Sequence, residues 1–182
     1  MSQFKFIALS GISGAGKTTL AKILAQNYNA IHFDEDDFYI EIKPKVTLSN
    51  GLSKSNWDTF DALKIKLLNQ EIKKCLQKNS VFLSGFALPD HIFDPDIKPD
   101  LHIHLRIPKS ESLKTRLAIK DFRDKSEVNN TLYFNECIVP FYEENLKNST
   151  IHHFIDVFDN DGNRKSLDKE IEEIEKVIKK LF

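Results

Sequence analysis

The feature that most constrains this chain is a glycine-rich segment, Gly11-Ile-Ser-Gly-Ala-Gly-Lys-Thr-Thr19. An apolar run, residues 4–10, precedes it, and a helical pattern, residues 19–26, follows it. A strand, then G-x-x-x-x-G-K-T, then a helix is the context in which this motif forms a P-loop. Its glycines let backbone N–H groups approach phosphate oxygens, and the helix N-terminus adds partial positive charge. The segment therefore predicts a nucleoside triphosphate site rather than a simple glycine-rich turn.

The polar residues of this motif have expected partners on the nucleotide. Lys17 is expected to reach the β- and γ-phosphates and to act in catalysis, while the Thr18 hydroxyl holds Mg²⁺. The residues expected to bind ATP here are Gly11, Ser13, Gly14, Ala15, Gly16, Lys17, Thr18 and Thr19. ATP and Mg²⁺ are thus the predicted phosphate donor and cofactor.

The composition is that of an ordinary soluble globular protein. The 182 residues are 41% hydrophobic and 29% charged, so we expect one domain covering residues 1–182. A net charge of −1 argues against a protein that binds nucleic acid. No apolar stretch reaches membrane-spanning length, and no signal peptide precedes the first apolar run. We therefore expect a cytoplasmic monomer or homodimer with a small-molecule partner and no membrane partner.

Apolar runs alternate with helical patterns along the whole chain. The expected strands cover residues 4–10, 30–33, 80–86, 101–107 and 154–158. The expected helices cover residues 19–26, 59–77, 109–122, 132–145 and 167–181. This alternation predicts an α/β, P-loop kinase-like fold with three layers, in which helices cover both faces of a five-stranded parallel sheet. Residues 40–56 are expected to form an irregular connection, residues 116–131 a small lid, and Pro140 a kink.

Phosphoryl transfer requires a carboxylate near the acceptor hydroxyl and cations around the phosphates. The acidic run Asp34-Glu-Asp-Asp37 follows the second expected strand, and open α/β sheets bind ligands beyond such strand ends. Arg116, Lys120 and Arg123 share one helix face at i, i+4 and i+7, where they can close over the phosphates. The alternatives are a solvated acidic turn and a solvated basic helix end.

Trp57 and Asp58 are the candidate acceptor-binding pair. The indole offers a flat surface for a ring, and the carboxylate can bind sugar hydroxyls. The alternatives are a tryptophan in the core and an aspartate that caps the helix expected at residues 59–77. The six histidines lack the spacing of a metal site.

From residue 4 to residue 146 the chain resembles the uridine kinase and nicotinamide riboside kinase group of P-loop kinases, and it is most similar to the nicotinamide riboside kinases. The resemblance rests on four segments, namely Gly11–Lys22, Asp36-Asp-Phe-Tyr39, Asn56-Trp-Asp58, and Arg123 with Tyr133-Phe-Asn135 ten residues later. One departure is Ser84, which stands where that group usually has a glutamate before Gly-Phe. Another is the segment between Arg123 and Tyr133, which is not proline-rich.

This resemblance implies roles for individual residues. Asp36 would be the catalytic base and, with Thr18, a Mg²⁺ ligand, and Phe38 of the same motif would contact the substrate. Trp57 would stack on the base of a nucleoside. Asp58 and Arg123 would hold its ribose. The shared helix face described above, and not this resemblance, predicts that Arg116 and Lys120 contact ATP.

The predicted reaction is therefore ATP- and Mg²⁺-dependent phosphorylation of the 5′-hydroxyl of a ribonucleoside, with nicotinamide riboside as the first candidate. Uridine, cytidine or another small metabolite is the alternative acceptor. A regulatory nucleotide-binding module with little transferase activity, suggested by Ser84, is the alternative of another class.

Overall fold

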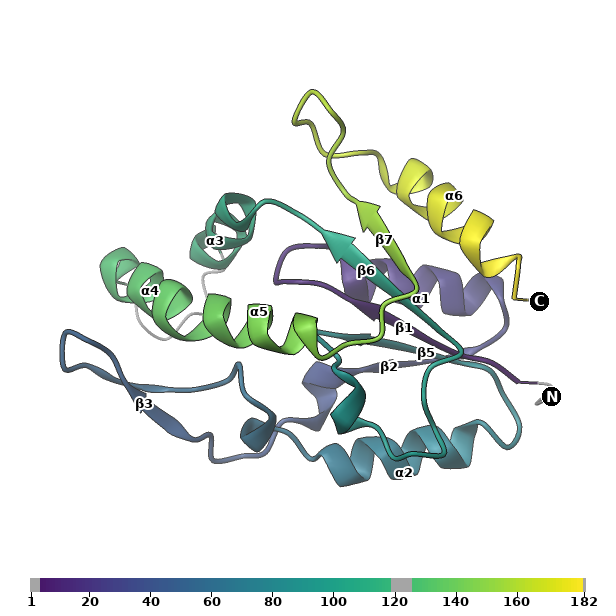
Figure 1. The fold of residues 1–182 in the computed structure, drawn as a ribbon, viewed down its shortest axis with the longest axis horizontal. Helices are drawn as coiled ribbons and strands as arrows, with labels where there is room; N and C mark the ends of the chain where they lie inside the picture. The colour runs from purple at the N-terminus through teal and green to yellow at the C-terminus, as the bar shows by residue number, and fades with distance from the viewer. Residues whose placement is uncertain (1–3, 119–125, 182) are drawn as a thin grey trace.

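A five-stranded parallel sheet forms the centre of the computed structural model, which describes residues 4–118 and 126–181 (Figure 1). Its strands are β1 (Phe6–Ser10), β2 (Ile31–Asp34), β5 (Val81–Gly85), β6 (Leu101–Arg106) and β7 (His153–Asp156). Their order is β2-β5-β1-β6-β7, and every neighbouring pair is parallel. This confirms the predicted α/β architecture. The strand order also brings the C-terminal ends of β1, β2 and β5 together at one end of the sheet.

Helices cover both faces of this sheet, as Figure 1 shows. They are α1 (Lys17–Asn27), α2 (Ile65–Cys75), α3 (Lys109–Ala118), α4 (Glu127–Tyr133), α5 (Val139–Lys147) and α6 (Leu167–Ile178). One core cluster packs α1 and α6 against the sheet, a second packs α2 against its other face, and a third lies beneath α4 and α5. Within residues 4–118 and 126–181, none of these helices combines the length and apolar character needed to cross a bilayer.

The helix expected at residues 132–145 is longer than predicted and contains a wide turn. A π-helical turn, Phe134–Ile138, joins α4 to α5 immediately before Pro140. Proline has no N–H and its ring crowds the preceding turn, so a local widening before it relieves the conflict. The predicted kink therefore takes the form of this π turn.

The connection at residues 40–56 is a hairpin, so the prediction of an irregular loop was wrong. Strands β3 (Lys45–Thr47) and β4 (Ser53–Ser55) pair antiparallel. Gly51 adopts a φ of 81° in the turn between them, which an Asn-Gly pair accommodates readily. The Ser49 backbone N–H donates to Glu136 Oε2 at 2.9 Å, so the hairpin docks on the helix that ends at Lys147.

The helix expected from residue 59 begins only at Ile65, after a 3₁₀ turn, Phe60–Ala62. The Ile40 backbone N–H donates to the Ala62 carbonyl at 2.8 Å, and Tyr39 forms an isolated β-bridge with Leu63. These contacts hold the chain outside helical geometry. Asp58 therefore does not cap this helix.

A buried polar network connects β1 and β6 to α5. Ser10 Oγ lies 2.6 Å from His102 Nε2 and 2.8 Å from His104 Nδ1. His104 Nε2 lies 2.6 Å from the Tyr142 hydroxyl. Burial lowers the pKa of His102 to about 4 and that of His104 to about 3, so both rings are neutral near pH 7. The network is thus a structural link under the P-loop.

This network predicts acid sensitivity. The pKa of an unfolded histidine lies near 6.5, so the unfolded state binds protons that the native state excludes as the pH falls from about 6.5 toward 4. We expect the free energy of unfolding to fall by on the order of 2–4 kcal/mol between pH 7 and pH 5. In the double variant His102→Gln/His104→Gln, the free energy of unfolding from chemical denaturation should depend much less on pH. The control His153→Asn, at an exposed position, should keep the wild-type pH dependence. A wild-type free energy of unfolding that does not change between pH 7 and pH 5 would contradict the conclusion that both histidines are neutral.

Candidate active site

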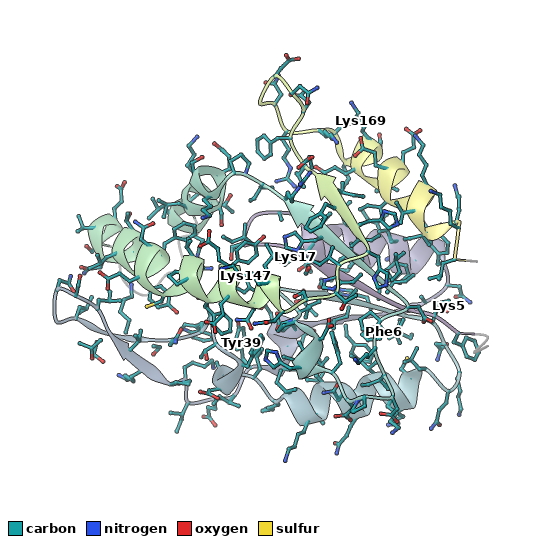
Figure 2. All side chains as sticks on the ribbon, in the orientation of Figure 1. Lys5, Phe6, Lys17, Tyr39, Lys147 and Lys169 are labelled. Atoms are coloured by element: carbon teal, nitrogen blue, oxygen red, sulfur yellow. The ribbon has the colours of Figure 1, made fainter. Side chains whose placement is uncertain are left out.

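A cleft of about 700 Å³ opens at the C-terminal ends of β1, β2 and β5. The P-loop supplies one part of its lining, the acidic turn after β2 a second, and the segment from β4 to Phe60 a third. Figure 2 labels Lys17 and Tyr39, which both line this cleft. Strand ends of a parallel sheet are where such folds bind ligands.

The P-loop has the backbone that its glycines allow. Gly14 and Gly16 adopt φ values of 86° and 89°, in the left-handed region that other residues avoid. Lys17 begins α1, and its Nζ donates to the Ile12 carbonyl at 3.3 Å. Burial lowers the pKa of Lys17, and the nearby carboxylates of Asp36 and Glu35 oppose this effect. The lysine is thus held beside the acidic turn.

The expected ATP-binding residues do not all face this cleft. Ser13, Lys17 and Thr18 line it. Ala15 is fully buried, and Thr19 lies at a second, smaller hollow beside Arg164. Contacts between these residues and a nucleotide stay a prediction.

Arg164, which sequence reasoning missed, supports the P-loop from the segment before α6. Its Nη1 donates to the Gly14 carbonyl at 2.9 Å, and its Nη2 donates to the Ala15 carbonyl at 3.3 Å. Its Nε lies 3.4 Å from an oxygen of Glu170, which is buried. No local pattern marks this arginine, because its partners lie 150 residues earlier in the chain.

The acidic turn after β2 is a 3₁₀ helix, Glu35–Phe38. The Asp34 carboxylate accepts from the Asp36 backbone N–H at 3.2 Å and so caps this turn. Asp36 faces the cleft. Partial burial raises the pKa of its carboxyl, the charge of Asp34 raises it further, and the charge of Lys17 lowers it. A carboxylate of raised basicity beside a cleft can accept a proton.

Phe38 lies elsewhere than the sequence reasoning placed it. Its side chain is only 9% exposed and packs in the core cluster that contains Leu83. The next residue, Tyr39, lines the cleft instead. Phe38 is in the core and not in the cleft because the apolar side of the 3₁₀ turn faces the sheet.

Glu35 is the buried member of the acidic turn. It is 3% exposed, and its Oε2 accepts from the Phe86 backbone N–H at 2.6 Å. Its Oε1 has no hydrogen-bond partner among the residues that the structure describes. Burial raises the pKa of this carboxyl to about 7.

Trp57 forms part of the far wall of the cleft. Its ring packs edge-on against Tyr39, with centroids 5.3 Å apart, and Lys43 Nζ lies 4.1 Å from its centroid. The Trp57 backbone N–H donates to the Tyr133 hydroxyl at 3.2 Å. The Tyr133 hydroxyl is also within 2.9 Å of Asn56 Oδ1 and 3.1 Å of Asp58 Oδ2. Of the expected acceptor residues, Trp57 and Asp58 therefore lie together on this wall.

Arg116 joins this wall to the P-loop. Its guanidinium donates to both oxygens of Asp58, at 3.1 and 2.9 Å, and to Ser13 Oγ at 2.7 Å. The Arg116 and Asp58 side chains are 11% and 7% exposed. Asp58, expected to bind ribose, is thus neutralised by the arginine expected to bind phosphate. Lys120, Arg123 and the middle of the expected lid, residues 119–125, lie outside the described residues.

The donor groups in the cleft fit a Mg²⁺ ion that is shared with a nucleotide. Thr18, Asp34 and Asp36 line the cleft together with Glu35, whose Oε1 is an unpaired buried oxygen. Across residues 4–118 and 126–181, no three histidine, cysteine or acidic side chains form a self-sufficient metal site. Mg²⁺ needs none, because it keeps several waters and binds one or two carboxylates with substrate phosphates.

Comparison with known proteins gives one family match and several partial matches. A family model described as shikimate kinase matches residues 13–137. A cytidylate kinase of Desulforamulus reducens is 34% identical over 110 residues, 59% of this chain and 47% of the relative. A nicotinamide riboside kinase of Saccharomyces cerevisiae is 37% identical over 76 residues, 41% of this chain and 31% of the relative. The chain thus spans less than half the length of these two relatives.

A solved structure of a sugar kinase from Janibacter sp. HTCC2649 is similar in fold. It has a TM-score of 0.55 and 16% identity, and the match covers 94% of this chain and 92% of that one. This similarity supports the predicted three-layer architecture.

The shielded ion pair across the cleft predicts a measurable coupling. In a double-mutant cycle with Asp58→Asn and Arg116→Gln, we expect a coupling energy above about 1.5 kcal/mol in chemical denaturation, because each single variant leaves a shielded charge unpaired. The control is the exposed Lys73–Asp96 pair, for which a cycle should give below about 1 kcal/mol. Equal coupling energies in the two cycles would show that Arg116 and Asp58 do not join the walls.

Proposed function

Since this chain belongs to the shikimate kinase family, we propose that it is a kinase that transfers the γ-phosphoryl group of ATP to a hydroxyl of a small molecule. The observation that carries this proposal is one continuous cleft lined by Lys17, Asp36 and Trp57. It combines a phosphate-binding cation, a carboxylate and an aromatic wall. Phosphoryl transfer depends mainly on such positioning and charge stabilisation.

The chain's own residues have clear tasks in this reaction. Lys17 stabilises charge on the β- and γ-phosphates, and the N-terminus of α1 orients them. Asp36 accepts the proton of the acceptor hydroxyl while the hydroxyl oxygen bonds to the γ-phosphorus and ADP leaves. Mg²⁺, when bound, neutralises phosphate charge. The Thr18 hydroxyl and the Asp36 carboxylate would hold it.

A ribonucleoside is the first candidate acceptor, phosphorylated at its 5′-hydroxyl, with nicotinamide riboside at the head of the panel. Trp57 supplies a stacking surface, and the Tyr133 hydroxyl, which is held by Asn56, supplies a polar group for hydroxyls. The partial match to the yeast nicotinamide riboside kinase supports this choice. Uridine and cytidine follow as acceptors of the same class.

The charges around the acceptor wall favour a second candidate, an acceptor that carries a carboxylate or phosphate. Lys43 Nζ lies over the ring of Trp57, a residue of the cleft wall, and Lys54 itself lines the cleft. Arg116 neutralises Asp58, so this carboxylate offers little attraction to a cationic ring. A cationic acceptor would meet repulsion from Lys43, whereas an acidic acceptor would be attracted.

The direct test of the proposed function is ADP release from ATP and Mg²⁺ across a panel of acceptors. The panel contains nicotinamide riboside, uridine, cytidine, shikimate and gluconate. The proposal predicts acceptor-dependent ADP release with at least one of these hydroxyl compounds. A regulatory module would bind ATP in calorimetry without any acceptor-dependent ADP release.

Replacement of the proposed base should separate chemistry from nucleotide binding. We expect Asp36→Asn to lower kcat about a hundredfold or more with the best acceptor, because the hydroxyl proton loses its positioned acceptor. The affinity for ATP measured in calorimetry without Mg²⁺ should change only a few-fold. The control is Asp37→Asn, which removes a neighbouring exposed carboxylate that does not line the cleft. Near-normal turnover of Asp36→Asn would disprove the assignment.

Lys43 provides a test of acceptor charge. We expect Lys43→Met to raise the KM of an acidic acceptor about tenfold, because a hydrogen bond or ion pair to a charged group contributes about 1.5 kcal/mol. The KM of a neutral acceptor should stay within about threefold, and that of a cationic acceptor should fall. Lys45→Met, which removes an exposed lysine of the same hairpin, is the matched control. An unchanged KM for an acidic acceptor would leave the nucleoside as the supported candidate.

A further inference from the structure

Glu35 has one oxygen that is held by the fold and one that is not. Oε2 accepts from the Phe86 backbone N–H at 2.6 Å, just beyond β5. Oε1 is buried without a hydrogen-bond partner in the described part of the chain. Buried carboxylate oxygens are nearly always hydrogen-bonded or bound to a cation, so an unpaired one calls for a partner.

The residue itself lies at the P-loop end of the cleft. Glu35 lines the cleft together with Thr18 and Asp36, and its charge interacts with that of Lys17. A Cβ added to Gly85 would lie 2.9 Å from Glu35 Oε2. The glycine at the end of β5 therefore leaves the space that this side chain occupies.

The end of β5 itself provides no carboxylate to the cleft. Ser84 is fully buried, and its Oγ lies 2.9 Å from His32 Nε2. Ser84 pairs with Asp34 in the register of β2 and β5, so the two strand ends are adjacent. An acidic side chain that begins after β2 can thus reach the end of β5, as the contact between Glu35 and Phe86 shows.

We propose that Glu35 provides a carboxylate to the hydration shell of the Mg²⁺ ion, since the end of β5 provides none. The inference rests on the proposed function, because the ion would be the one that accompanies the nucleotide. Oε2, anchored by Phe86, fixes the carboxylate, and Oε1 accepts hydrogen bonds from the hydrated ion. Mg²⁺ retains several waters in such sites, and carboxylates that hold these waters tune its affinity. The competing explanation is a purely structural carboxyl that ties the acidic turn to β5.

Two variants separate charge from shape. Glu35→Gln keeps the length of the side chain and an oxygen that can accept from Phe86, but it removes the negative charge. Glu35→Asp keeps the charge but shortens the side chain by one methylene. Asp37→Asn is the matched control, since it removes one exposed carboxylate from the same turn.

The measurement is the affinity for ADP in calorimetry, with Mg²⁺ and with a chelator instead. The ratio of the two affinities is the Mg²⁺-dependent gain. We expect Glu35→Gln to lower this gain about tenfold to a hundredfold, with Glu35→Asp between it and the wild type. The affinity for ADP without metal should stay within about twofold in every variant. Mn²⁺ binding, followed by electron paramagnetic resonance in the presence of ADP, should give the same order.

If Glu35 has only a structural role, the variants should differ in thermal stability and not in the Mg²⁺-dependent gain. Glu35→Asp, which cannot keep the contact with Phe86, would then be the less stable variant in thermal unfolding, and all variants would keep the wild-type gain. That result would overturn the inference. Failure of the wild-type chain to bind ADP at all would instead overturn the proposed function. An unstable Glu35→Gln still leaves Glu35→Asp and the Mn²⁺ measurement to decide.

Discussion

The geometry of this cleft depends on one shielded interaction, the pair between Arg116 and Asp58. The arginine contacts both oxygens of Asp58 and, at 2.7 Å, the hydroxyl of Ser13 in the P-loop. It therefore connects the phosphate-binding loop, the end of α3 and the wall that carries Trp57. Paired carboxylate and guanidinium groups that are largely shielded from water are costly to separate. The interaction therefore ties the P-loop side of the cleft to the wall that carries Trp57.

The rest of the machinery is arranged around that span. The parallel sheet places the P-loop and the acidic turn at neighbouring strand ends, and Arg164 holds the P-loop from behind through the Gly14 and Ala15 carbonyls. The hairpin of β3 and β4 docks on the helix that contains Tyr133. Under the proposed function, donor chemistry would rest on the sheet, whereas acceptor recognition would rest on the hairpin and the helices beside it. This division explains how one fold can serve kinases with different acceptors.

Local patterns predicted the five strands of the central sheet, their parallel arrangement and the P-loop, because apolar periodicity and glycine spacing act over short distances. They missed the hairpin of β3 and β4. The site was only partly predictable. Asp36 was chosen because it follows a strand end, and it does line the cleft, but the phase of the 3₁₀ turn buries Phe38 and places Tyr39 in the cleft lining. Asp58 was interpreted as a cap or a sugar ligand, and its partner Arg116 lies 58 residues away. Pairings of this length leave no periodic signal, and Arg164 escaped for the same reason.

The central claim is that this cleft moves a phosphoryl group from ATP to a hydroxyl. The most direct test is ³¹P NMR of the wild-type chain with ATP, Mg²⁺ and candidate acceptors. The account predicts a new phosphomonoester resonance that grows with ADP in equal amounts and requires the acceptor. If ATP binds but stays intact, or yields only inorganic phosphate and ADP, with every hydroxyl compound offered, the account is contradicted.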